Sequence, residues 1–269
     1  WGGDGRSNFA LPNLSGRAII GQGSTPGLTT RHPGDATGQI STSLTVAQLP
    51  SHTHALPGGG STGATGGGQP FSNMMPSLPM HTLIAANGAV PAPAANGGTL
   101  DAAFVGQIAT FSGTFTPGGW LEADGSLLAI SQYDALFSVI GTTYGGDGQN
   151  TFALPNLTGR VAVGRNANHP VGSAWGEEST TLTLAQMSQH GHQLTNGGSA
   201  LSAGGTTPVS NDQPSLAVSY LIATEGVYPG REGGAGFDTD VPVLGQLTAF
   251  AGSFAPRGWT FADGQLMSI

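Results

Sequence analysis

The sequence of 269 residues contains no cysteine and no lysine, and only 8% of its residues are charged. Without cysteine it can form no disulfide framework, iron–sulfur cluster or thiol nucleophile. The seven basic residues are all arginines scattered along the chain, and the formal net charge is −8. Binding to nucleic acid needs cations gathered against the phosphates, so we exclude this class of partner. No apolar run approaches the ~18 residues that suggest a membrane span.

Glycine is abundant instead, with 46 residues, and apolar residues make up 38% of the chain. Glycine does not recur at every third position, which excludes a collagen-like triple helix. The apolar content is sufficient for a packed core. A surface rich in Gly, Thr, Ser and Asn is typical of a β architecture with many turns. We therefore expect a β-rich α+β fold with short helices and long Gly-rich loops.

Long segments of the sequence occur twice. The run WGGDGRSNFALPNLSGR at 1–17 returns as YGGDGQNTFALPNLTGR at 144–160. The run LTVAQLPSHTH returns, 138 positions later, as LTLAQMSQHGH. A third run, GQIATFSGTFTPGGWLEADGSLLAI at 106–130, returns as GQLTAFAGSFAPRGWTFADGQLMSI at 245–269. The chain is therefore a tandem repeat of one small domain.

One copy of the repeat is continuous in the sequence, and the other is divided between its two ends. Residues 106–241 form one complete unit, residues 1–105 form a unit without its N-terminal head, and residues 245–269 form a head without a body. The head at 245–269 could complete the first unit of a neighbouring subunit. Alternatively, the natural chain is a longer array of which these residues are one window.

Local patterns predict the elements of a unit. Residues 131–143 have no second copy and predict a helix, with Ser131 as N-cap and Asp134 at the capping-box position. Thr45 with Gln48, and their counterparts in the second copy, predict capping boxes that open one helical turn. Alternating apolar residues at 216–222 predict a strand, although a short helix fits almost as well. The Gly-rich stretches 57–69 and 88–99 show no periodicity and predict loops.

The order of these motifs resembles the phage tail collar domain, a family that includes bacterial homologues described as microcystin-dependent proteins. The resemblance rests on the run at 106–130, on ALFSVIGTTYGGDG at 135–148 and on FALPNLTGRVAVG at 152–164. It implies tandem collar-type domains in a non-enzymatic structural protein of a tail or fibre. It also implies a place on a virion tail or the extracellular surface, where collar-type domains form trimeric ends that face a cell-surface receptor.

A His-x-His motif occurs in each copy, as His52 and His54 and as His190 and His192. In an extended segment, residues i and i+2 point to the same side, so both imidazoles of a pair can reach one metal ion. Three chains around an axis would supply six nitrogens. Imidazole suits Zn, Fe, Ni or Cu, and the resemblance supports an axial divalent metal, Zn or Fe. The alternative is that these histidines cap turns or bond backbone carbonyls.

Other polar residues fit structural roles better. Asp4 and Asp147 lie in matched Gly-Gly-Asp-Gly loops, where an aspartate stabilises a tight turn through its own backbone. Arg17 and Arg160 follow matched glycines, where we expect a bond to a carboxylate or carbonyl. The sequence contains no Gly-x-Ser-x-Gly elbow and no acid–base pair common to both copies. We therefore predict no enzymatic activity.

Two functions remain open. In the first, the protein is the subunit of an extracellular filament in which the head of one molecule completes the next, a heterologous contact that propagates. The proposed assembly interface consists of the apolar residues of that head: Leu247, Phe250, Phe254, Trp259, Phe261 and Leu266. In the second, the protein is a trimeric, receptor-binding collar component of a phage or phage-like tail, with His-x-His metal sites.

Overall fold

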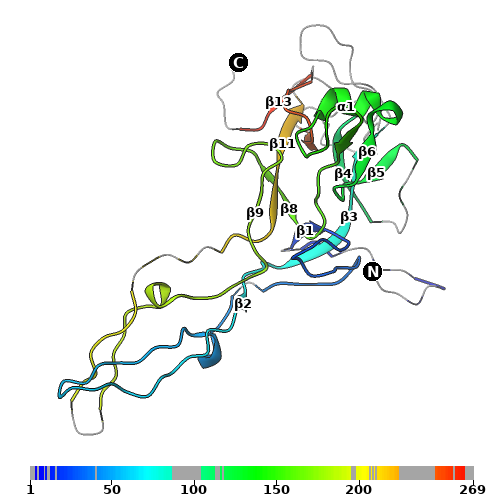
Figure 1. Ribbon diagram of the computed structural model, residues 1–269. Coiled ribbons are helices and arrows are strands. Elements are labelled where there is room, and N and C mark those ends of the chain that lie inside the picture. The colour runs from blue at the N-terminus through cyan, green and yellow to red at the C-terminus, as the bar shows by residue number, and fades with distance from the viewer. Residues whose placement is uncertain are drawn as a thin grey trace, which may run out of the picture. The chain divides into compact units, whose positions relative to one another are not determined.

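The computed structural model of the chain consists of two units, each built from segments that are distant in the sequence (Figure 1). The first unit contains residues 1–36, 78–175 and 214–269, and the second contains residues 37–77 and 176–213. The structure describes residues 4–86, 104–194, 198–223 and 246–263, except for 5, 9, 11, 12, 16, 40, 113–115, 117, 206, 208, 210 and 257. The predicted loop at 88–99 lies outside these residues.

A nine-stranded sheet belongs to the first unit. Its main path runs β1–β3–β4–β12–β11–β13, while β5 pairs with β3, and β8 and β9 pair with β11. The strands are β1 Ala18–Gly21, β3 Ser77–Ala85, β4 Gln107–Phe111, β5 Trp120–Glu122, β8 Val161–Gly164, β9 Ala174–Trp175, β11 Ser215–Ala223, β12 Leu247–Phe250 and β13 Trp259–Phe261. The expected β-rich α+β class is confirmed, and the strand predicted at 216–222 is β11.

Repeated segments form the same pairings within this sheet. In β3, Leu83 pairs with Ala109 of β4, and in β11 the corresponding Leu221 pairs with Thr248 of β12. The strand β5 pairs with β3 in the register that β13 adopts with β11. The two halves meet where β4 and β12 lie antiparallel to each other. The sheet thus combines two equivalent halves, and the head at 245–269 pairs with β11 of its own chain.

A second pairing brackets the helix of the first unit. β6 (Leu127–Ala129) and β7 (Thr151–Ala153) are antiparallel, with Leu128 opposite Phe152. Between them lie a 3-10 turn, η2 (Ile130–Gln132), and the helix α1 (Asp134–Ile140). The prediction of a helix is confirmed, but its N-cap is Tyr133 and not Ser131. Ser131 lies in the 3-10 turn, which starts where the amide of Ile130 donates to Asn150 O and extends the β6–β7 pairing.

The apolar core of the first unit forms around β7 and α1. Phe152 and Leu136 are fully buried, and the ring of Phe152 lies 5.5 Å from that of Phe137. The buried residues of this core cluster include Ile84, Phe104, Val105, Ile108, Leu136, Val139, Ile140, Phe152, Leu154, Leu157, Leu216, Val218, Phe250 and Trp259. Both copies of the repeat therefore contribute to one core, which provides most of the hydrophobic stabilisation of this unit.

The second unit contains little regular structure. Two 3-10 turns, η1 (Val46–Gln48) and η3 (Leu184–Gln186), start at the predicted capping boxes, which are confirmed. The short strands β2 (Phe71–Ser72) and β10 (Ser179–Thr180) pair antiparallel and join one copy of the repeat to the other. Part of the Gly-rich stretch 57–69 is paired rather than free, because Thr65 exchanges two backbone hydrogen bonds with His52.

Candidate metal site

The first His-x-His motif follows η1 in the second unit. The amide of Thr45 donates to Gln48 Oε1 over 2.9 Å, which closes the turn and directs the chain into an extended segment. His52 then pairs with Thr65 of the Gly-rich return segment, so the backbone of the motif is held on one side. This pairing leaves the imidazoles to project away from the backbone ladder.

The second motif is built in the same way. Thr183 donates to Gln186 Oε1 over 2.9 Å, and η3 leads into a segment in which His190 pairs with Ala203. The two motifs meet within one chain, because Leu201, in the return segment of the second copy, bonds the first motif. The amide of Leu201 donates to Ala55 O, and its carbonyl lies 2.8 Å from His54 Nδ1.

Three of the four imidazoles have the same hydrogen bond at Nδ1. This atom lies 2.9 Å from Pro50 O in His52, 2.8 Å from Leu201 O in His54, and 3.0 Å from Ser188 O in His190. A carbonyl can only accept, so the proton is on Nδ1 and the lone pair is on Nε2. A backbone carbonyl on one ring nitrogen is the arrangement that orients metal-ligating histidines.

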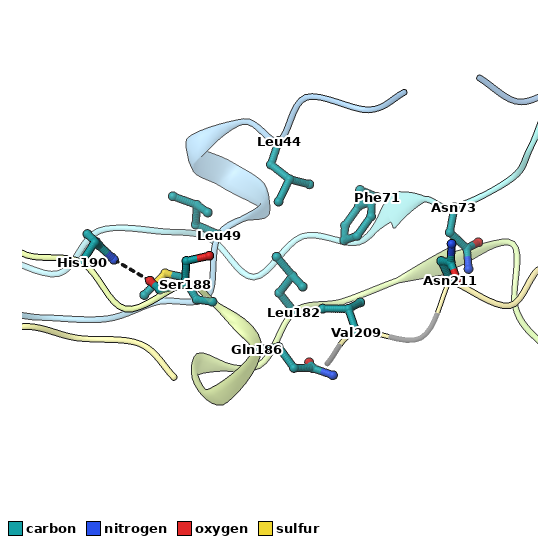
Figure 2. Close-up of a pocket in the computed structure, with 11 residues that line it drawn as sticks. Leu44, Leu49, Phe71, Asn73, Leu182, Gln186, Ser188, His190, Val209 and Asn211 are labelled. Carbon is teal, nitrogen blue, oxygen red and sulfur yellow. Dashed lines mark hydrogen bonds between the residues drawn. The ribbon is translucent and has the colours of Figure 1, made fainter. Parts of the chain in front are cut away.

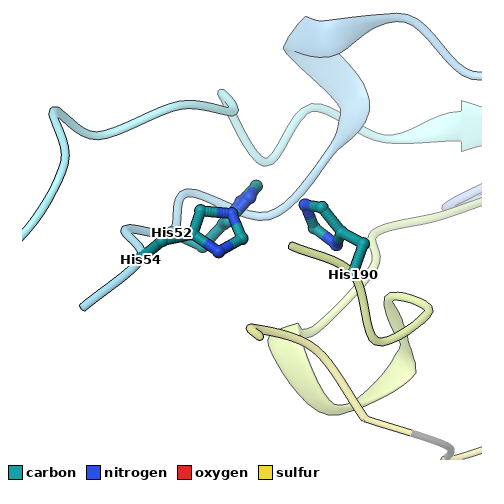
Figure 3. A group of neighbouring side chains, drawn as sticks. All are labelled: His52, His54 and His190. Carbon is teal, nitrogen blue, oxygen red and sulfur yellow. The ribbon is translucent and has the colours of Figure 1, made fainter. Parts of the chain in front are cut away.

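The imidazoles also lie close together (Figure 3). Ligand nitrogens of His52, His54 and His190 all lie within 4.8 Å of one another. The ring centroid of His192 lies 4.8 Å from that of His54 and 5.2 Å from that of His190. A zinc ion with Zn–N bonds of ~2.0–2.1 Å would draw the nitrogens of a tetrahedral site about 3.4 Å apart. Modest adjustments of the side chains would therefore bring the nitrogens of three of these residues within bonding distance of one ion.

Burial of the cluster differs between the two copies. His52 is 7% exposed and His54 4% exposed, whereas His190 is partly buried and His192 is exposed. His54 Nε2 is buried and has no hydrogen-bond partner. An unsatisfied buried nitrogen is costly, and a metal ion bound to its lone pair would remove that cost. The cluster therefore fits a divalent metal, and His52, His54 and His190 could hold one.

The other histidines occupy different places. The ring of His169 stacks on Trp175, with centroids 3.9 Å apart. His81 lies in β3 opposite Phe111, and the amide of His32 donates to Asp35. Among the described side chains, those of His32 and His169 do not join the metal-binding group. The distance between the two His-x-His pairs could not be predicted from the sequence.

Comparison with known proteins gives one match. Residues 106–162 match the family model of the Phage Tail Collar Domain. This segment of the chain is therefore similar to a phage tail collar domain. No curated protein and no solved structure matches the chain. The family is a structural phage tail family, so the match indicates a structural role in a virion tail. All four paired histidines lie outside the matched collar domain.

The matched collar domain extends from the residue before β4 to the first residues of β8. It contains β6, α1 and β7, and therefore much of the core of the first unit. In the part of the chain that the structure describes, no helix has the length and the apolar character needed to cross a bilayer.

Asp147 organises the turn that precedes β7 in the collar domain. Its Oδ1 accepts hydrogen bonds from the amides of Thr151, Asn150 and Gln149, which hold the pKa of the carboxyl far below its usual value of 3.8. Gly146 before it has a φ of +95°, and a Cβ there would lie 2.4 Å from Phe152 Cα. In the matched loop, Asp4 Oδ1 accepts from the amides of Arg6, Ser7 and Asn8. The predicted turn role of both aspartates is confirmed.

This turn predicts a pH dependence of stability. A lowered pKa in the folded state means that the Asp147 carboxylate stabilises the fold above the unfolded pKa, and that this stabilisation is lost as pH falls below about 4. We expect Asp147→Asn to lower the melting temperature at pH 7 and to differ less from the wild type at pH 3. Differential scanning calorimetry across this range measures the effect. Glu177→Gln is the control, and an equal pH profile for both variants would contradict the prediction.

The five described residues of the predicted assembly interface fall into three groups by burial. Phe250 is fully buried and Trp259 is 7% exposed, both in this chain's own core. Phe254 and Phe261 pack against that core and are partly buried. Leu247 is 63% exposed, and Leu266 lies outside the described residues. Phe250 and Trp259 are therefore unavailable on the surface, and a role between subunits would require β12 and β13 to be exchanged.

An apolar pocket, which the sequence did not reveal, lies beside the histidines of the second unit (Figure 2). Its volume is about 550 Å³. Matched positions of the two copies face each other across it, such as Leu44 with Leu182 and Phe71 with Val209. His190 also lines the pocket. The two copies thus enclose a common apolar space next to the candidate metal site.

Proposed function

We propose that the protein is a non-enzymatic structural subunit of a phage-type tail fibre or extracellular filament, assembled from head to tail through its split copies of the collar unit. The collar match supports the structural role. The observation that carries the mode of assembly is the β6–β7 pair, which joins the end of the head to the segment that follows α1. By sequence correspondence, residues 266–268 match β6 and residues 8–10 match β7.

In the proposed assembly, the end of the head at 245–269 pairs with residues 8–10 of the next subunit. Leu266 would then lie opposite Ala10, as Leu127 lies opposite Ala153. Phe9 corresponds to Phe152, which is fully buried in the core. Because Phe250 and Trp259 are already buried within the chain, the junction is assigned to the segment after β13. The contact is heterologous and therefore repeats along a filament.

The proposal includes a divalent metal, zinc or iron, bound by His52, His54 and His190, with His192 as a further ligand. The ion would link the two copies of the repeat, since two ligands come from each. With all four imidazoles bound, the ion would have the closed coordination of a structural site.

A second function, a trimeric receptor-binding collar component, is favoured by one observation. The histidines of the first copy are buried while His192 is exposed, so one side of the cluster is open to ligands from another chain. A site with six imidazoles around one ion would need histidines from neighbouring chains.

Electron microscopy of the purified protein tests the two assemblies against each other. Open filaments with one two-copy subunit per repeat are expected for the head-to-tail assembly. Discrete particles with three-fold symmetry would instead support the trimeric collar component. Monomers at all concentrations, measured by analytical ultracentrifugation, would contradict both.

A further inference from the structure

A second cavity lies in the first unit, at the junction of the two equivalent halves of the sheet. Its volume is about 550 Å³, within the size range of sites for small ligands. It is bounded by β4 and β12 and by the turns that precede β1 and β8. The lining residues that carry the argument are Arg17, Arg160, Thr82, Gln107, Thr248 and Leu247.

The repeat explains why two arginines reach one cavity. β4 and β12 pair with Ile108 opposite Ala249, and this register places Ala109 opposite its own counterpart, Thr248. A local two-fold axis therefore passes between these two strands. Arg17 and Arg160 are counterparts in the Leu-x-Gly-Arg turns, so the axis brings them to the same space from opposite halves.

Both arginines donate hydrogen bonds to backbone carbonyls of their own turns. Arg17 Nη1 donates to Asn13 O over 3.1 Å, and Arg160 Nη1 donates to Asn156 O and Thr158 O over 3.4 Å. These bonds stay within each arginine's own turn and use Nη1 alone. No acidic residue is among the described residues that line the cavity, and no described carboxylate pairs with either guanidinium.

Arg17 and Arg160 are both partly buried residues, and burial lowers the pKa of Arg160. A partly buried cation that pairs with no described carboxylate is unfavourable. Each arginine keeps further N–H donors whose planar arrangement suits the two oxygens of a carboxylate or phosphate. Thr82, Gln107 and Thr248 add neutral polar groups to the same lining.

We propose that this cavity binds a small oxyanion-bearing ligand, the size of an acidic monosaccharide, whose carboxylate or phosphate is held by Arg17 and Arg160. The neutral polar residues then face the hydroxyl groups of the ligand. This site is independent of the proposed assembly and of the histidine cluster, which belongs to the other unit. It gives a structural tail protein a means of recognising an anionic surface component.

Isothermal titration calorimetry of the full chain tests the proposal with glucuronate, glucose 6-phosphate and glucose as probes. We expect at least one acidic probe to bind and glucose to bind at least tenfold more weakly, because charge-assisted hydrogen bonds are roughly twice as strong as neutral ones. Binding of glucuronate alone identifies a carboxylate site, and binding of glucose 6-phosphate alone identifies a phosphate site. Equal binding of glucose, or no binding of either acid, overturns the proposal.

Variants connect the binding to the cavity. Arg17→Gln and Arg160→Gln should each weaken the acidic probe about tenfold or more, while Arg6→Gln, an exposed arginine outside the cavity, should not. Leu247→Glu is a second test that leaves both arginine turns intact, because Leu247 is 63% exposed. Its carboxylate would occupy the anion position and abolish binding. Unchanged affinity in Leu247→Glu and in both Arg→Gln variants would overturn the proposal.

Discussion

Zinc added to chelator-treated protein is expected to raise its melting temperature, and His54→Ala is expected to abolish this rise. His54 Nε2 is buried and unpartnered, and its Nδ1 is already held by Leu201 O, so the side chain is oriented to donate a lone pair to an ion. At a metal concentration about 100 times Kd, binding to the folded state alone stabilises by roughly 2.7 kcal/mol. Loss of a direct ligand should weaken binding by more than the roughly 10–100-fold cost of losing a supporting hydrogen bond.

The control is His169→Ala, which removes an imidazole that stacks on Trp175 outside the cluster. This variant should respond to zinc as the wild type does. Metal analysis of the protein as purified, by mass spectrometry, identifies the natural ion and separates zinc from iron. If the imidazoles only bond backbone carbonyls, His54→Ala would lower the melting temperature equally with and without metal, and the metal proposal would be wrong.

The sequence predicted those features whose causes are local. The capping boxes at Thr45 and Thr183, the strand β11 and the turn role of Asp147 each depend on residues within a few positions of one another. The repeat identified the two His-x-His pairs as equivalent. Local rules therefore recovered the elements and the candidate ligands, and the composition predicted the β-rich class.

The features that the sequence did not predict depend on contacts between copies. His54 Nδ1 reaches Leu201 O, 147 positions away, and no periodicity marks that contact. In the Gly-rich stretch, Thr65 bonds His52 through its backbone and not through its side chain. No apolar pattern in the sequence therefore marks this pairing. The meeting of Arg17 and Arg160 in one cavity likewise requires the β4–β12 register. Backbone pairing between repeats leaves little trace in residue type, which explains why the elements were easier to predict than the sites.

Burial in the head segment also changes how the assembly is interpreted. The sequence predicted that all six apolar residues of the head form one interface for assembly. In the fold, Phe250 and Trp259 fill the core beside β11, because the head pairs with the body strand that precedes it in the chain. In the proposed assembly, the contact between subunits is then made by the end of the head that corresponds to β6, and the β6–β7 pair predicts its register.

This register makes a specific crosslink the sharpest test of head-to-tail assembly. Leu127 pairs with Ala153, so Leu266 of one subunit should lie opposite Ala10 of the next. Opposed residues in antiparallel strands have Cα atoms about 4.5–5.5 Å apart, which a disulfide can bridge. The chain has no cysteine of its own, so any disulfide in the double variant Ala10→Cys, Leu266→Cys reports this pair.

Under oxidation we expect the double variant to give a ladder of covalent oligomers on a denaturing gel, which collapses when reductant is added. Each chain then carries one bond to the subunit before it and one to the subunit after it. The single variants Ala10→Cys and Leu266→Cys are matched controls, because one cysteine can link two chains at most and no ladder can form. A monomer closed by an internal disulfide would show that the two segments pair within one molecule, and the head-to-tail assembly would then be wrong.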